Sequence, residues 1–255
     1  MPEYIPGAEP LYEKRGPVGC LLLHGFTGAV HEMRQVAAYL AERDITVHVP
    51  CMAGHGTSPD DMNATRWPDW YRSAREALDR IKSECGTVFV AGLSMGGMQT
   101  LHLATHDRDV RGFISYAGPV FVRNWKLSLF GPLMRHTPII KIYRYDKGIG
   151  DDIHDPEAIK THISYKYTPT ACVLSLLEYM NHVRQDLAEI SAPLLIMQAR
   201  QDHTVHPDNA NVIHNEVSSK DKEIVWLDNS YHVITVDYDK QIVFEKTYEF
   251  IQKHL

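Results

Sequence analysis

The sequence lacks the features that mark several classes of protein. No apolar run approaches the roughly 20 residues that a membrane-spanning helix needs; Val18 to Leu23, for example, spans only 6 residues. The 255 residues include 4 cysteines and no C-x-x-C pair, which indicates reduced, mostly structural thiols. Basic residues do not predominate, because 26 Lys and Arg stand against 32 Asp and Glu. The resulting charge of -6 argues against a nucleic-acid partner, and we expect no stable membrane insertion.

The beginning of the chain carries no recognisable targeting pattern. Residues 1–6 contain neither a basic patch nor an apolar run. Together with the thiols, this predicts a cytoplasmic protein. The sequence leaves the oligomeric state open between a monomer and a homodimer.

Hydrophobic periodicity predicts one α/β domain. With 44% hydrophobic residues, a chain of this length can bury a full core. Apolar runs predict buried strands, and apolar residues at steps of three and four predict helices between them. The strands are expected at 18–24, 45–50, 87–92, 112–117, 193–199 and 222–227, and the helices at 30–43, 68–84, 95–106, 207–217 and 240–254. Because strands that alternate with helices form βαβ crossovers, we expect a mostly parallel central sheet with helices on both faces.

One interval breaks this alternation. Residues 119–191 contain no convincing buried strand but several short helical patterns separated by prolines and glycines. Structureless loops of that length are uncommon in compact domains. We therefore expect a core made of residues 1–118 and 192–255, with residues 119–191 inserted as a helical cap over the strand ends.

Charge is uneven within the expected cap. Residues 123–147 carry six basic side chains and one acidic side chain, Asp146. This excess is either a solvated face or a surface that draws anionic or interfacial substrate toward the entrance.

The pentapeptide Gly92-Leu93-Ser94-Met95-Gly96 joins a predicted strand to a predicted helix. A serine at such a junction sits on a tight, strained turn with its hydroxyl above the sheet, and the flanking glycines allow neighbouring backbones to approach. The position predicts that Ser94 is a nucleophile. A serine hydroxyl reacts poorly at neutral pH, so it needs a histidine to take its proton and a carboxylate to orient that histidine.

His232 and Asp202 occupy the positions that these partners require. His232 follows the last predicted strand, and Asp202 follows the strand at 193–199. Most of the other histidines fall in predicted helices, in a strand or in the insertion. Asp208 and Asp228 have the right chemistry, but Asp208 falls in the next helix and Asp228 is too close in sequence to His232. The order Ser94, Asp202, His232 is the chain order expected for a nucleophile on this kind of turn.

Two backbone N–H groups are expected to stabilise the oxyanion that forms when the serine attacks. Met95 supplies one, because it follows the nucleophile and begins a helix whose dipole favours an anion. The second is expected from Phe26, in the loop His24 to Gly28 after the first predicted strand, where Gly25 allows the chain to bend.

Other chemistries are less well supported by the sequence. Asp202-His203 with His206 suggests a metal site, but Pro207 places the start of the helix after these residues, and we expect no metal. His55 is expected to pack or to bond locally. Cys51 is expected to fill space near a strand end rather than to act as a nucleophile.

The motifs resemble those of the α/β-hydrolase superfamily, in its group of bacterial carboxylesterases and monoacylglycerol lipases. They are H-G-F-T-G at 24–28, G-H-G-T-S-P at 54–59, G-L-S-M-G-G at 92–97, Q-A-R-Q-D at 198–202 and N-S-Y-H-V-I-T at 229–235. The resemblance runs from about Gly16 to the C-terminus and is weak in the insertion. It implies the α/β-hydrolase fold, the triad Ser94, Asp202 and His232, and an oxyanion hole formed by Phe26 and Met95.

One departure concerns the pocket. Tyr231 stands beside His232 where this group usually has glycine, and we expect it to narrow the pocket mouth. The divergent insertion makes the substrate preference of the group a poor guide for this chain.

These observations predict a serine carboxylesterase that hydrolyses small-molecule esters of short to medium acyl chains through an acyl-enzyme, without a cofactor. A monoacylglycerol lipase acting on longer-chain monoglycerides is the nearest alternative. A catalytically silent ligand receptor is an alternative of a different class, against which the complete triad argues. Thioester, lactone, peptide and carbon-carbon bond hydrolysis use the same constellation.

Overall fold

A computed structural model describes residues 3–122, 144–146 and 152–255 of the chain. Most of the basic segment 123–147 lies outside the described residues, so the two interpretations of its charge both stay predictions. Among the described residues, no helix is both long enough and apolar enough to cross a membrane.

The central sheet has seven strands in the order β1-β3-β2-β4-β5-β8-β9. Six strands run parallel, and β1 pairs with the edge of β3 in the antiparallel direction. The bounds are β1 Leu11–Glu13, β2 Val18–Leu23, β3 Ile45–Val49, β4 Thr87–Leu93, β5 Gly112–Tyr116, β8 Leu194–Ala199 and β9 Lys222–Leu227. All six predicted strands are present, while the three-residue β1 was not predicted.

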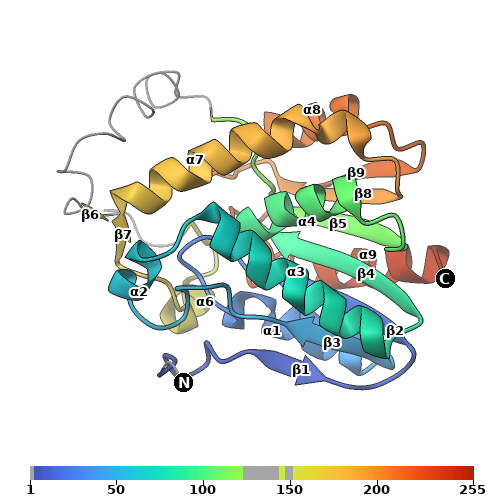
Figure 1. The fold of residues 1–255 in the computed structure, drawn as a ribbon, viewed down its shortest axis with the longest axis horizontal. Coiled ribbons are helices and arrows are strands. Elements are labelled where there is room, and N and C mark those ends of the chain that lie inside the picture. The colour runs from blue at the N-terminus through green and yellow to red at the C-terminus, as the bar shows by residue number, and fades with distance from the viewer. Residues whose placement is uncertain (1–2, 123–143, 147–151) are drawn as a thin grey trace.

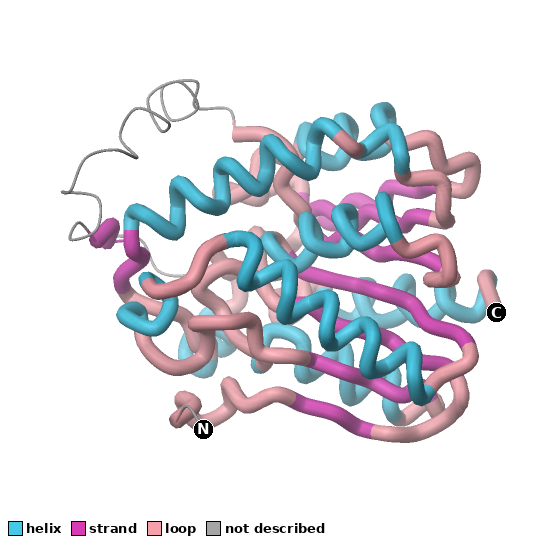
Figure 2. Tube along the Cα trace, in the orientation of Figure 1, coloured by secondary structure: helices cyan, strands magenta, loops and turns pink. Residues whose placement is uncertain are grey.

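Helices cover both faces of the sheet (Figure 1 and Figure 2). Helices α1 and α9 pack on one face, α3, α4 and α8 pack on the other, and α7 packs against α3 and α4. The bounds are α1 His31–Ala41, α2 Pro59–Asn63, α3 Trp67–Glu84, α4 Met95–His106, α7 Thr170–Gln185, α8 Asp208–Glu216 and α9 Lys240–Lys253. The predicted mostly parallel sheet with helices on both faces is confirmed.

Alternation along the central strands divides the core into two layers. In β2, Cys20 and Leu22 face the layer of α1 and α9, whereas Leu21 and Leu23 face the layer of α3 and α4. Successive side chains of a strand point to opposite faces, so a strand covered on both faces must be apolar throughout. This is why the buried runs in the sequence show no polar alternation.

The described part of the insertion contains helices and one short strand pair. Helix α6 spans Pro156–Thr161, and a 3-10 helix, η2, spans Leu187–Glu189. Strands β6, Arg144–Asp146, and β7, Tyr167–Pro169, pair antiparallel. Tyr165 of this segment lies against the loops that follow β2 and β3, because its N–H donates to Thr27 and its hydroxyl donates to Gly54. The boundaries of the cap at 119 and 191 stay a prediction.

Candidate active site

Ser94 lies on a sharp turn between β4 and α4 with φ +56° and ψ -115°. Its N–H donates to the carbonyl of Tyr116 at 2.8 Å, and its own carbonyl accepts from Met98 at 3.0 Å as the helix begins. A Cβ at Gly92 would lie 2.2 Å from the carbonyl oxygen of Gly96, and a Cβ at Gly96 would lie 2.2 Å from that of Leu23. Only glycine fits at these two positions, because the obstructing atoms belong to the backbone.

Ser94, His232 and Asp202 form a continuous hydrogen-bonded line. The hydroxyl of Ser94 donates to Nε2 of His232 at 2.9 Å. Nδ1–H of His232 donates to Oδ2 of Asp202 at 2.8 Å. The side chains come from the loops after β4, β9 and β8, and parallel strands bring these three loops to one edge of the sheet.

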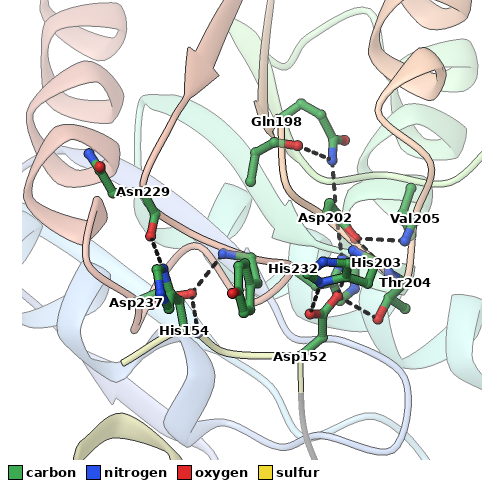
Figure 3. A network of polar contacts seen from close by, with 12 residues as sticks. Asp152, His154, Gln198, Asp202, His203, Thr204, Val205, Asn229, His232 and Asp237 are labelled. Carbon is green, nitrogen blue, oxygen red and sulfur yellow. Dashed lines mark hydrogen bonds and ion pairs between the residues drawn. The ribbon is translucent and has the colours of Figure 1, made fainter. Parts of the chain in front are cut away.

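The Asp202 carboxylate accepts hydrogen bonds on both oxygens (Figure 3). Oδ1 accepts from the N–H groups of Thr204 at 2.9 Å and Val205 at 2.7 Å. Oδ2 accepts from the Gln198 amide at 2.8 Å as well as from His232. Burial alone would raise the pKa of Asp202, but His232 and these donors offset burial and hold that pKa below its ordinary value.

Burial and charged neighbours also compete at His232, where each shifts the pKa in the direction opposite to that at Asp202. Burial of His232 favours the neutral ring and so lowers the pKa. The charge and hydrogen bond of Asp202, followed by the charges of Asp152 and Glu32, more than offset that effect and raise the pKa above its ordinary value. A neutral imidazole here accepts a proton more readily than a free histidine does, and the resulting imidazolium lies beside a carboxylate.

The loop after β2 is held rigidly beside Ser94. Nε2 of buried His24 accepts from the N–H of Met52 at 3.0 Å, and Nδ1–H donates to the carbonyl of Gly25. Burial lowers the pKa of His24 to about 4, so the ring is neutral and both nitrogens serve these bonds. The N–H of Gly25 donates to Oε2 of Glu32 at 2.7 Å.

The two expected oxyanion donors are adjacent to this arrangement. Within the described ranges, neither the N–H of Phe26 nor that of Met95 donates to another protein atom. The Phe26 ring packs edge-to-face on Trp70 at 5.4 Å and on His55 at 6.2 Å, which fixes the loop. Both N–H groups are therefore left without a protein acceptor in the described part of the chain.

The structure brings together the three predicted catalytic side chains and leaves their rivals outside. Asp208 lies exposed at the start of α8, and exposed Asp228 pairs with Arg200 at 3.0 Å. His55 bonds locally, as predicted, with Nδ1 at 3.1 Å from the carbonyl of Ala53. Burial raises the pKa of Cys51 to about 12, in agreement with its predicted role as a filler.

Two further side chains next to the catalytic line were not predicted from the sequence. Glu32 lies on the buried face of α1 together with Val36 and Leu40. A carboxylate at an apolar position of an amphipathic helix can be recognised in the sequence and indicates a special role. Asp152 carried no such signal, because nothing in its local sequence relates it to loops fifty or more residues away. His203, part of the rejected metal site, contacts Asp152, and the described part of the chain contains no group of three or more His, Cys, Asp or Glu side chains arranged to hold a metal.

Comparisons with known proteins show which family and which relatives the chain resembles. Residues 18–239 match the family described as serine aminopeptidase, S33. The thermostable monoacylglycerol lipase of Bacillus sp. strain H-257 is 41% identical over 250 residues, covering 98% of this chain and 96% of that protein. The carboxylesterase of Bacillus subtilis strain 168 is 31% identical over 247 residues, covering 96% of each.

Solved structures place the fold among the α/β-hydrolases. A chain from the study of LipS and LipT, two metagenome-derived lipolytic enzymes, has a TM-score of 0.86 and 32% identity, covering 99% of this chain and 100% of that one. A soluble variant of the monoglyceride lipase of Saccharomyces cerevisiae has a TM-score of 0.80 at 17% identity, which bears on the fold alone and covers 96% of this chain and 91% of that one.

Proposed function

The chain belongs to the serine aminopeptidase, S33, family of α/β-hydrolases, and from this premise we propose that Ser94, His232 and Asp202 hydrolyse carboxylic esters through an acyl-enzyme. Relatives named carboxylesterase and monoacylglycerol lipase cover nearly the whole chain, and the protein is a carboxylic ester hydrolase. The observation that carries the residue assignment is the hydrogen-bonded line from the Ser94 hydroxyl through His232 to Asp202.

The first half of the reaction forms the acyl-enzyme. Oγ of Ser94 attacks the ester carbonyl while Nε2 of His232 takes the serine proton. Asp202 holds Nδ1–H of His232 in place and stabilises the imidazolium. When the tetrahedral intermediate collapses, His232 gives the proton to the leaving alcohol and the acyl group stays on Ser94. Water then repeats the attack with His232 as the base, which releases the acid and restores the serine.

The negative oxygen of each tetrahedral intermediate needs donors that are already in place. We assign this role to the N–H groups of Phe26 and Met95, which flank Ser94 and have no acceptor among the described residues. One such donor contributes about 3 kcal/mol to transition-state stabilisation. Met95 also opens α4, so the N-terminal end of that helix faces the same oxygen.

The preferred acyl length separates two kinds of ester hydrolase. We propose esters of short to medium acyl chains as the substrates. Longer-chain monoglycerides are the second candidate, because the relative at 41% identity is named a monoacylglycerol lipase. Tyr231 supports the first, because its ring stacks on His154 at 4.4 Å beside the catalytic histidine and is expected to narrow the pocket mouth.

A substrate panel tests both parts of the proposal. The panel contains p-nitrophenyl esters from acetate to palmitate, 1-monoacylglycerols of the same chain lengths and an aminoacyl p-nitroanilide. We expect Ser94→Ala to lose ester hydrolysis by a factor on the order of 10⁴ or more, whereas Ser83→Ala, at an exposed serine near the far end of α3, retains it. Ester hydrolysis that survives Ser94→Ala would exclude the nucleophile. Long-chain monoglycerides as the best substrates would favour the lipase, and cleavage of the anilide alone would favour a peptidase.

The proposal also covers the cellular location, the oligomeric state and the partner of the protein. Four free cysteines, three of them buried, fit a reducing compartment, and we propose a cytoplasmic monomer or homodimer. Its proposed partner is a small-molecule ester rather than a nucleic acid, in keeping with the charge of -6. Cell fractionation and light scattering on the purified protein test these two points.

A further inference from the structure

Asp152 of the insertion touches the loops of both catalytic partners of Ser94. Its Oδ2 accepts from the N–H of His203 at 2.9 Å and from the hydroxyl of Thr204 at 3.0 Å, and Oδ1 lies 2.9 Å from Nδ1 of His203. Its backbone carbonyl accepts from the N–H groups of His232 at 3.0 Å and Val233 at 3.2 Å. Figure 3 shows the Asp152 side chain directed at the loop that carries Asp202.

The residues that follow Asp152 strengthen the same connection. The carboxylate of buried Asp237 accepts from the N–H groups of His154 at 2.8 Å, Asp155 at 2.9 Å and Tyr231 at 2.8 Å. The His154 ring lies 2.7 Å through Nδ1 from the carbonyl of Asn229, and it stacks on Tyr231. Residues 152–155 therefore run across the histidine loop and are bonded to it on both sides of His232.

These contacts matter because Asp202 and His232 come from different loops. The 2.8 Å separation of Oδ2 and Nδ1 depends on the relative position of the loops after β8 and β9. A displacement of about 1 Å in a catalytic arrangement can reduce the rate by on the order of a hundredfold. Asp152 bonds to the residues directly after Asp202 and to the backbone of His232 itself, so it bridges the two loops beside the pair.

We propose that Asp152 is a positioning residue of the ester-hydrolysis site, which holds the Asp202 loop through its carboxylate and the His232 loop through its backbone carbonyl. This inference rests on the proposed roles of Ser94, Asp202 and His232. It gives the insertion a part in the chemistry besides any part in forming the substrate pocket.

The charge of Asp152 supplies a signature that a purely structural contact lacks. Among the described residues, the charged groups that face His232 are Asp202 from the loop after β8, Asp152 from the insertion and Glu32 from α1, and all three raise the pKa of His232. His203 borders Asp152, and His162 lies 3.6 Å from Glu32. Removing the Asp152 charge therefore lowers the pKa of His232, and the acid limb of the kcat/KM profile moves to lower pH.

The test compares Asp152→Asn, Asp152→Ala and the control Asp228→Asn by pH–rate profiles with a p-nitrophenyl ester. Asp152→Asn keeps an acceptor of the same size, so we expect the shifted acid limb with a modest loss of kcat. Asp152→Ala also frees the Asp202 loop, and we expect kcat to fall on the order of tenfold. Asp228→Asn removes one negative charge from an exposed side chain near the same loops, and it should leave the profile unchanged. A uniform loss of rate with an unmoved acid limb, or no change in either Asp152 variant, would overturn the proposal.

An NMR titration separates this inference from the proposed function. The ring signals of His232, assigned by their loss in His232→Gln, are followed against pH in the Ser94→Ala background with and without Asp152→Asn. We expect the His232 midpoint to fall when Asp152 is replaced, and an unchanged midpoint would refute the coupling. If the unmodified chain hydrolyses no ester, the proposed function fails, and the titration still decides whether Asp152 acts on His232.

Discussion

The backbone at Ser94 predicts that removing its side chain entirely makes the protein more stable than shortening it to alanine. Ser94 has φ +56° and ψ -115°, a conformation that glycine adopts easily and residues with a Cβ adopt at a cost. Ser94→Ala and Ser94→Gly both lose the hydroxyl and its bond to His232, so the difference between them isolates the Cβ.

The size of that difference follows from two opposing effects. Releasing a residue from a sparsely populated conformation of this kind recovers roughly 1–3 kcal/mol. Glycine costs about 0.5–1 kcal/mol through the greater freedom of the unfolded chain. We therefore expect the free energy of unfolding of Ser94→Gly to be about 1 kcal/mol higher than that of Ser94→Ala. This difference corresponds to about 2–4 °C in Tm for a chain of this size.

Thermal unfolding at several scan rates, checked by urea unfolding, measures this difference. Ser115 provides a matched control, because it is a buried serine within β5 and has no positive φ. There, Ser115→Gly should melt below Ser115→Ala, by about 2–4 °C for a loss near 1 kcal/mol. If Ser94→Gly also melts below Ser94→Ala, the turn at Ser94 stores no backbone strain and the steric explanation of that turn is wrong.

Three further predictions concern stability and catalysis. Burial lowers the pKa of His24 to about 4 and that of His55 to about 3, so the unfolded chain binds more protons below about 6.5. The two neutral histidines therefore contribute fully to stability above that pH, and the free energy of unfolding should fall toward pH 4 by about 1.4 kcal/mol per pH unit for each histidine. Urea unfolding that shows no such fall would contradict this prediction. Trp70 is fully buried beneath Phe26, so Trp70→Ala should lower the free energy of unfolding by about 3–5 kcal/mol in urea, and a loss below 1 kcal/mol would refute its packing role. Asp202→Asn should reduce kcat by a factor on the order of 10⁴, because the amide no longer holds the required tautomer of His232, and steady-state kinetics within tenfold of the unmodified protein would exclude Asp202.

The sequence contained most of the fold because its buried strands are uniformly apolar and its helices are periodic. Helix α4 and strand β9 have the predicted bounds, Met95–His106 and Lys222–Leu227. Strand β1, Leu11–Glu13, escaped prediction because three half-buried residues at a sheet edge carry almost no pattern. Helix α2 is also short, yet Ser58 caps it and Pro59 occupies its first turn, a start signal that could have been recognised.

The site divides in the same way. Ser94, Asp202 and His232 could be picked out because each follows a strand, and parallel strands place their carboxyl ends at one edge. Asp152 differs, because it contacts a segment about fifty residues away, and that contact depends on how the insertion lies on the core. Periodicity and motif spacing describe local structure, so they carry no information on that packing.

The most direct test of the central claim is the mass of the covalent intermediate. The protein is mixed with a p-nitrophenyl ester, quenched with acid within the first turnover and digested for peptide mass spectrometry. The account predicts a burst of p-nitrophenol and an acyl group on the peptide that contains Ser94, with neither seen in Ser94→Ala. An acyl group on another residue, or full ester hydrolysis in Ser94→Ala, would contradict it.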